Sequence, residues 1–211
     1  TEITLSWYND PTLVIAVGMA VFSILFGTRS IDASEHHRGL MLAIAFESIV
    51  KLIAFVAVGI YAVYVIRNGL GDVFQQAMAT PKFNSVLTDY STPIVYLTHA
   101  LIGGIAIFAL PRQFHAAVVE YDRPDDLQTA RWLFPLYLLL INFFILPIAL
   151  VGGLWFANAN DFQTQYMTLW IPQATGADGL ALLAYIGGLS AGTSMVIIAS
   201  VALATMLSNE I

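Results

Sequence analysis

The sequence predicts an all-α integral membrane domain that crosses the bilayer about five times. The first observation is composition, since 58% of the 211 residues are hydrophobic and only 10% are charged. Soluble domains carry roughly 25% charged and about 45–50% apolar residues. The second is a series of apolar runs of spanning length, and the third is the alternation of positive charge between the connections. One globular core of this size cannot bury so much apolar surface, so we expect lipid to cover part of it.

Five apolar stretches are long enough to be considered as membrane spans. A spanning helix needs about 20 mostly apolar residues, because the hydrocarbon core is roughly 30 Å thick and each residue rises 1.5 Å. The expected spans are residues 11–27, 40–66, 93–110, 132–157 and 180–207. Each is predicted to be a helix, since backbone groups in lipid must satisfy their own hydrogen bonds. We therefore expect residues 1–211 to form a single membrane domain, with a short surface helix in VFQQAMATPKF before Pro81.

Positive charges in the connections predict the orientation of these spans. Cytoplasmic connections are enriched in Lys and Arg. The connections after the first and third spans hold Arg29, Arg38, Arg112, Arg123 and Arg131, whereas the other two hold only Arg67 and Lys82. Five positive residues against two place the first and third connections in the cytoplasm. We expect a multi-pass protein of the inner (plasma) membrane, with residue 1 outside and residue 211 in the cytoplasm.

Several functional classes are disfavoured by the residues present. The chain has no cysteine and a formal net charge of −6, which argues against thiolate metal sites and a nucleic-acid partner. No nucleophile elbow or phosphate-binding glycine loop is present, so we expect no enzyme activity from this segment. Two small groups, Glu35 with His36 and His37, and His115 with Glu120, lack the ligand number of a metal centre. Both read as solvated connections.

Two charged residues, Glu47 and Lys51, lie inside the second expected span. Each charge at the bilayer centre costs roughly 2.5–3.5 kcal/mol on insertion scales, so neither is expected to face lipid alone. Their spacing of four residues puts both on one helix face, with Glu before Lys, which is the favourable order for a pair. An intramembrane ion pair accounts for both residues. A relay for ions or protons is the alternative.

The fifth expected span is rich in small residues and hydroxyls. Gly188 and Gly192 have the GxxxG spacing, which allows another backbone to approach closely. Thr193 and Ser194, with the Ser190 carbonyl before them, supply the oxygen ligands that a hard cation such as Na⁺ prefers. Alternatively, the hydroxyls bond to carbonyls one turn earlier in their own helix. Spacing alone leaves both interpretations open.

The third expected span contains Thr98 and His99, then Gly103 and Gly104, and ends before Pro111. Glycine-interrupted spans are typical of the broken helices that line binding sites in secondary transporters. An ionisable residue within a span, such as His99, is a candidate functional group. A histidine near the outer end of a helix can also simply be hydrated. The pattern therefore predicts an interrupted helix that lines a solute site.

Three stretches together resemble the sodium/solute symporter family. They are ILFGTRSIDASEHH, LPRQFHAAVVE and GGLSAGTSMVIIASVALATMLSNE. The family has the leucine-transporter fold of inverted five-helix repeats, so the resemblance implies a partial bundle of that type. It places Thr193 and Ser194 on the paired hydroxyls of the sodium-site helix, and Ser190 on the preceding carbonyl position. It also implies Phe108 as an aromatic gate beside the solute.

The stretches FGTRSIDASEHHRGLMLAIAFESIVKLIAFVAVG and LPRQFHAAVVEYDR more closely resemble the symporter-like membrane domain of CbrA-type sensor histidine kinases. This resemblance implies an excerpt that holds the fourth to eighth core helices of a longer chain. Further transmembrane helices and cytoplasmic kinase domains of a two-component system would then be partners in the same chain. No cofactor is implied beyond Na⁺ or H⁺ as coupling ion.

These resemblances imply that the chain is part of a cation-coupled symporter-like domain. It would bind a small polar solute, which we expect to be an amino acid, at the middle of the membrane. A plain sodium/solute symporter without a kinase is one alternative. A membrane sensor that binds the solute without transporting it is another.

Overall fold

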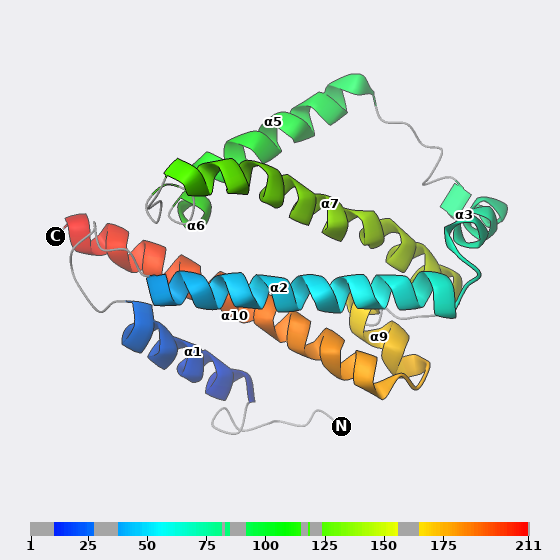
Figure 1. Ribbon diagram of the computed structural model, residues 1–211, viewed down its shortest axis with the longest axis horizontal. Helices are drawn as coiled ribbons and strands as arrows, with labels where there is room; N and C mark the ends of the chain where they lie inside the picture. The colour runs from blue at the N-terminus through cyan, green and yellow to red at the C-terminus, as the bar shows by residue number, and fades with distance from the viewer. Residues whose placement is uncertain are drawn as a thin grey trace, which may run out of the picture. The chain divides into compact units, whose positions relative to one another are not determined.

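The computed structural model describes residues 11–27, 38–81, 83–84, 92–114, 118, 124–155 and 165–210. All regular structure in this part of the chain is helical (Figure 1). The all-α prediction is therefore confirmed for the described residues. The helices group into two compact units, which are described separately. One unit comprises Thr1–Ala45, His99–Asp122 and Gly192–Ile211, and the other comprises Phe46–Thr98 and Arg123–Ala191.

Three helices in the described ranges are long and apolar enough to cross a membrane. Their candidate spans are Met41–Val65, Asp125–Trp155 and Asp178–Ala204. They lie in α2 (Arg38–Ile60) with its continuation η2 (Tyr61–Val65), in α7 (Pro124–Trp155) and in α10 (Asp178–Glu210). These elements coincide with the second, fourth and fifth spans expected from the sequence. The chain therefore has the helices of a membrane protein.

The first and third expected spans are also helices, but shorter ones. Helix α1 (Pro11–Gly27) and helix α5 (Pro93–Ala109) have 17 residues each. Both begin with proline, which suits the first helical position because its missing N–H has no partner there. At 1.5 Å per residue each helix is about 25 Å long, slightly less than the hydrocarbon thickness. Five crossings and the orientation stay predictions.

Helix α5 runs without interruption through Gly103 and Gly104. The interruption expected at these glycines is absent from this helix, and α5 ends only at Ala109, before the four-residue helix α6 (Pro111–Phe114). Glycine weakens a helix by about 1 kcal/mol relative to alanine, which neighbouring helical residues readily offset. Proline at position 111 disfavours helix at the residue before it, so the chain breaks there instead.

Three further differences concern the connections. Helix α7 begins at Pro124, eight residues before the expected span, with Asp125 and Asp126 in its first turn. Carboxylates at this end favour the helix because they meet its positive dipole. Helix α9 (Met167–Ala174) lies where only a connection was expected. Helix α3 (Leu70–Ala79) confirms the short helix before Pro81.

Helix α3 is not a detached surface helix. It packs against α7 and η2, and its Val73 and Ala77 are fully buried. Its start is fixed by polar contacts: Arg67 Nη1 donates to Gln76 Oε1 at 2.7 Å, and Gln76 Nε2 donates to Asp72 Oδ1 at 2.7 Å. Apolar burial and this short hydrogen-bond chain together hold α3 against the long helices.

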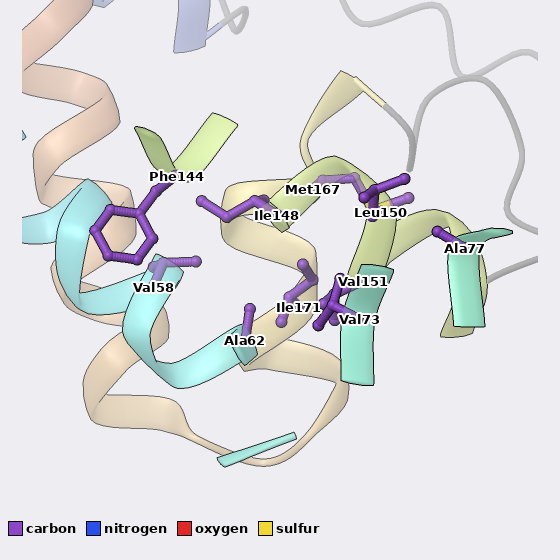
Figure 2. Close-up of a cluster of buried hydrophobic side chains, with 10 residues drawn as sticks. All are labelled: Val58, Ala62, Val73, Ala77, Phe144, Ile148, Leu150, Val151, Met167 and Ile171. Carbon is purple, nitrogen blue, oxygen red and sulfur yellow. The ribbon is translucent and has the colours of Figure 1, made fainter. Parts of the chain in front are cut away.

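The core of the Phe46–Thr98 and Arg123–Ala191 unit is one cluster of buried apolar side chains. Figure 2 shows the cluster, in which Val58, Val151 and Ile171 come from η2's neighbour α2, from α7 and from α9. The full set is Val58, Ala62, Val73, Ala77, Phe144, Ile148, Leu150, Val151, Met167 and Ile171. The other unit has a small cluster in which Ile44 packs against Ile197 and Val201. The larger cluster holds α2, α3, α7 and α9 together around the features described next.

Candidate functional site

A cavity of about 220 Å³ lies in the unit formed by Phe46–Thr98 and Arg123–Ala191. Its walls come from α2, α7, α9 and α10. The lining residues are Lys51, Ala54, Phe55, Val58, Ile141, Thr168, Ala184, Gly187, Gly188 and Ala191. Apolar and small residues dominate this lining, and Lys51 is its one charged residue while Thr168 adds a hydroxyl. Apolar walls with a few polar groups are typical of small-molecule sites.

Lys51 lies close to the middle of its candidate span. It follows Met41 by 10 residues and precedes Val65 by 14, so along the helix it lies about 15 Å from one end and about 21 Å from the other. Lysine reaches the membrane surface easily only near helix ends. Because Lys51 is far from both ends, the ammonium belongs to the interior of the protein.

The ion pair expected between Glu47 and Lys51 is not formed. Within the described ranges, no Asp or Glu oxygen lies within 4 Å of the Lys51 amine, and Lys51 has no hydrogen bond to a described residue. The Glu47 Oε2 atom is buried and likewise has no hydrogen-bond partner there. A spacing of four residues permits contact between two long side chains but does not enforce it, because each can turn toward other space. Both charged groups are thus available to something other than each other.

Helices α2 and α10 approach closely beside the cavity. A Cβ atom added to Gly187 would lie 2.5 Å from the Ala54 Cβ and 3.7 Å from the Lys51 Cα. One turn along α10, Ser190 Oγ donates to the Glu47 backbone carbonyl at 3.4 Å. The expected close approach of small residues is therefore present, but it uses Gly187. Gly188 and Gly192 have no described atom within 4 Å of an added Cβ.

The hydroxyls expected to bind a cation are placed along α10. Ser194 is buried at 5% exposure, and Ser190 and Thr193 are half-buried. The Ser190 hydroxyl is engaged with the Glu47 carbonyl, which supports a packing role for that side chain. Its own backbone carbonyl was the expected ligand. Ser190 belongs to one unit, whereas Thr193 and Ser194 belong to the other. The cation-site assignment stays a prediction.

The residues expected to line a solute site lie on α5 and are exposed. Thr98 Oγ1 donates to the Ile94 carbonyl one turn earlier at 2.8 Å, and Thr98 does not line the cavity. His99 is exposed, and Gly103 and Gly104 have no described atom near an added Cβ. Phe108 lies in α5, but its side chain is outside the described residues, as are Glu35, His36, His37, His115 and Glu120.

Sequence reasoning found Lys51 but not the cavity beside it. Thr168 lies in a segment expected to be a connection, and Phe55 and Ile141 have no feature that separates them from other apolar span residues. Only the charge at Lys51 and the glycines at 187 and 188 signalled this region. A cavity arises from the packing of several helices, and no sequence period reports it.

No metal-binding group of three or more His, Cys, Asp or Glu residues occurs in the part of the chain that the structure describes. Comparisons of the chain with protein-family models, with curated proteins and with solved structures found no match.

Proposed function

We propose that the chain is the membrane part of a solute-binding transport domain, with the α2–α7–α9–α10 cavity as its solute site. The observation that carries the proposal is the position of Lys51, a charged residue that lines a cavity near the middle of a candidate span. Ionisable residues within spans are costly, and in membrane proteins they commonly mark the paths of substrates and ions. A purely structural membrane subunit would not require such a residue at a cavity.

The resemblance to sodium/solute symporters supports the same function from the sequence. Secondary transporters bind solutes near the bilayer midplane and move one helix bundle against another around the site. In this proposal the solute is a small polar molecule of the amino-acid class. Na⁺ or H⁺ supplies the driving force, and the α10 hydroxyls Thr193 and Ser194 are candidate cation ligands.

The test is uptake of a radiolabelled amino-acid mixture into proteoliposomes that contain the whole protein, under an inward Na⁺ or H⁺ gradient. The variant Gly188→Leu places a side chain where an added Cβ meets no described atom and where the cavity is lined. We expect it to reduce uptake at least tenfold because the side chain occupies the solute volume. The matched control is Gly192→Leu, four residues along the same helix, with equally open space but outside the cavity lining.

Three outcomes bear on the proposal. Uptake that is lost in Gly188→Leu and retained in Gly192→Leu supports it. Equal uptake by both variants and the unmodified protein contradicts the assignment of the cavity. Solute binding without gradient-driven uptake contradicts transport, and it favours the sensor that the resemblance to CbrA-type kinases implies.

A further inference from the structure

Lys51 is an ammonium whose charge nothing in the described chain neutralises. It has no ion pair and no hydrogen bond among the described residues, and the carboxylate of Glu47, one turn earlier, is beyond ion-pair distance. A desolvated charge is unfavourable unless it is paired and hydrogen-bonded. Lys51 therefore favours occupation of its surroundings by a group of opposite charge.

The shape of the site limits what that group can be attached to. An apolar cavity of roughly 150 Å³ accommodates benzene, so a cavity of about 220 Å³ has room for a ring or branched alkyl group with one small polar substituent. The walls near Lys51 are apolar, as Phe55, Val58 and Ile141 illustrate. The described lining has a single positive charge and no carboxylate. It thus offers a partner for one anionic group and no counter-charge for a cationic one.

We infer that the cavity binds a small molecule with one carboxylate and an apolar body, in which the carboxylate pairs with the Lys51 ammonium and the apolar part lies against Phe55, Val58 and Ile141. The Thr168 hydroxyl supplies a second polar contact. This inference rests on the proposed function, because it names the chemical class of the solute at the same cavity. It excludes sugars and other neutral polyols, whose many hydroxyls would remain unsatisfied against these walls.

The probes are phenylacetate and phenylacetamide, which have the same shape but differ in charge. Binding of each to the whole protein in lipid nanodiscs is measured by isothermal titration calorimetry. We expect phenylacetate to bind at least about 30-fold more tightly, because loss of one partner from a desolvated charge pair has an effect of this order. Equal affinities for the two probes, or no binding of either at millimolar concentration, would overturn the inference.

Two substitutions assign the discrimination to Lys51. Lys51→Met keeps the length of the apolar stem and removes the charge, so it should reduce the preference for phenylacetate to less than about threefold. Lys51→Arg keeps the charge and should retain most of the preference. Because methionine is well tolerated in a membrane helix, folding of Lys51→Met is checked by its thermal transition. Full discrimination by a folded Lys51→Met protein would show that another group recognises the carboxylate.

A long-chain fatty acid has the same carboxylate and is present in membranes. Palmitate is therefore titrated as a competitor of phenylacetate. Weak or absent competition supports a small ligand, whereas palmitate that displaces phenylacetate at lower concentration than phenylacetate itself overturns the size limit. Lys51-dependent binding of phenylacetate without uptake would reject transport and leave the ligand class standing. Gradient-driven uptake of neutral solutes alone would do the reverse.

Discussion

Two regions of one unit use glycine in opposite ways. In the buried cluster, the space beside Gly59 is filled by the Phe144 ring, the space beside Gly152 by Met167, and the space beside Gly153 by Phe83. At the cavity, Gly188 has no described atom within 4 Å of an added Cβ. Glycine lets helices and side chains approach closely only when a partner occupies the space that it leaves. Without one, the same residue leaves a void.

The difference separates a region that holds the fold from a region that can accept a ligand. Interiors are close-packed, and any loss or gain of volume there is costly. A cavity lined by small residues has already given up these contacts, so changes there should affect stability little. Three substitutions, in decreasing order of expected effect, test this contrast.

The largest effect is expected from Phe144→Ala in the cluster. Phe144 is 8% exposed, and truncation of a buried phenylalanine typically costs about 3–5 kcal/mol because it leaves a void. The measurement is the free energy of unfolding in a mixed detergent titration. The neighbouring Phe143, at 52% exposure, is the control, and Phe143→Ala should cost less than about 1.5 kcal/mol. Equal losses for the two variants would break the contrast, because the cluster would then not be the tightly packed region.

A smaller effect is expected from Gly59→Ala. The added methyl would overlap the Phe144 ring and its Cβ, and overpacking of a core costs about 1–3 kcal/mol. Gly188→Ala is the matched control at the cavity. It should be neutral or stabilise by up to about 1 kcal/mol, since alanine is the better helix former and meets no described atom. Comparison of the two thermal midpoints measures the difference. A destabilised Gly188→Ala would mean that its surroundings are filled.

The smallest effect is expected from Tyr61→Phe at the polar edge of the cluster. The Tyr61 hydroxyl donates to Thr175 Oγ1 at 3.0 Å, and an interhelical hydrogen bond in membrane proteins contributes about 0.6 kcal/mol on average. Tyr64→Phe is the control because Tyr64 is 60% exposed. Urea-free detergent titrations of both variants resolve the difference when run in parallel. A loss above about 2 kcal/mol for Tyr61→Phe would show that the hydroxyl matters more than the apolar packing around it.

Long apolar runs predicted the main helices because hydropathy and length are local properties. The second, fourth and fifth expected spans correspond to α2 with η2, to α7 and to α10. Helix α9 escaped prediction because it has eight residues and contains Pro172, so no apolar period identifies it. The surface placement of α3 was wrong because burial of Val73 depends on where α7 lies. Sequence patterns report an element well and its neighbours poorly.

The candidate site was predicted in its charges but not in its geometry. Lys51 and Glu47 stood out because charge is rare within spans, yet their contact was wrongly expected from spacing alone. The close approach of α10 to α2 was foreseen, but at Gly188 and Gly192 rather than at Gly187. A shift of one residue turns a helix face by about 100°. Several adjacent glycines therefore cannot be ranked until the partner helix is in place.

The π-helical turn of η2 shows how one residue can set the direction of a chain. The Ile66 amide donates to the Tyr61 carbonyl at 3.1 Å, five residues back, so this turn holds one residue more than an α-helical turn. Such turns commonly arise inside α-helices as single extra residues. The surplus rotates everything after it by about a quarter of a revolution, and Gly69, at φ 106°, then reverses the chain. A related chain that lacked this residue would aim its next helix elsewhere, whatever its remaining side chains.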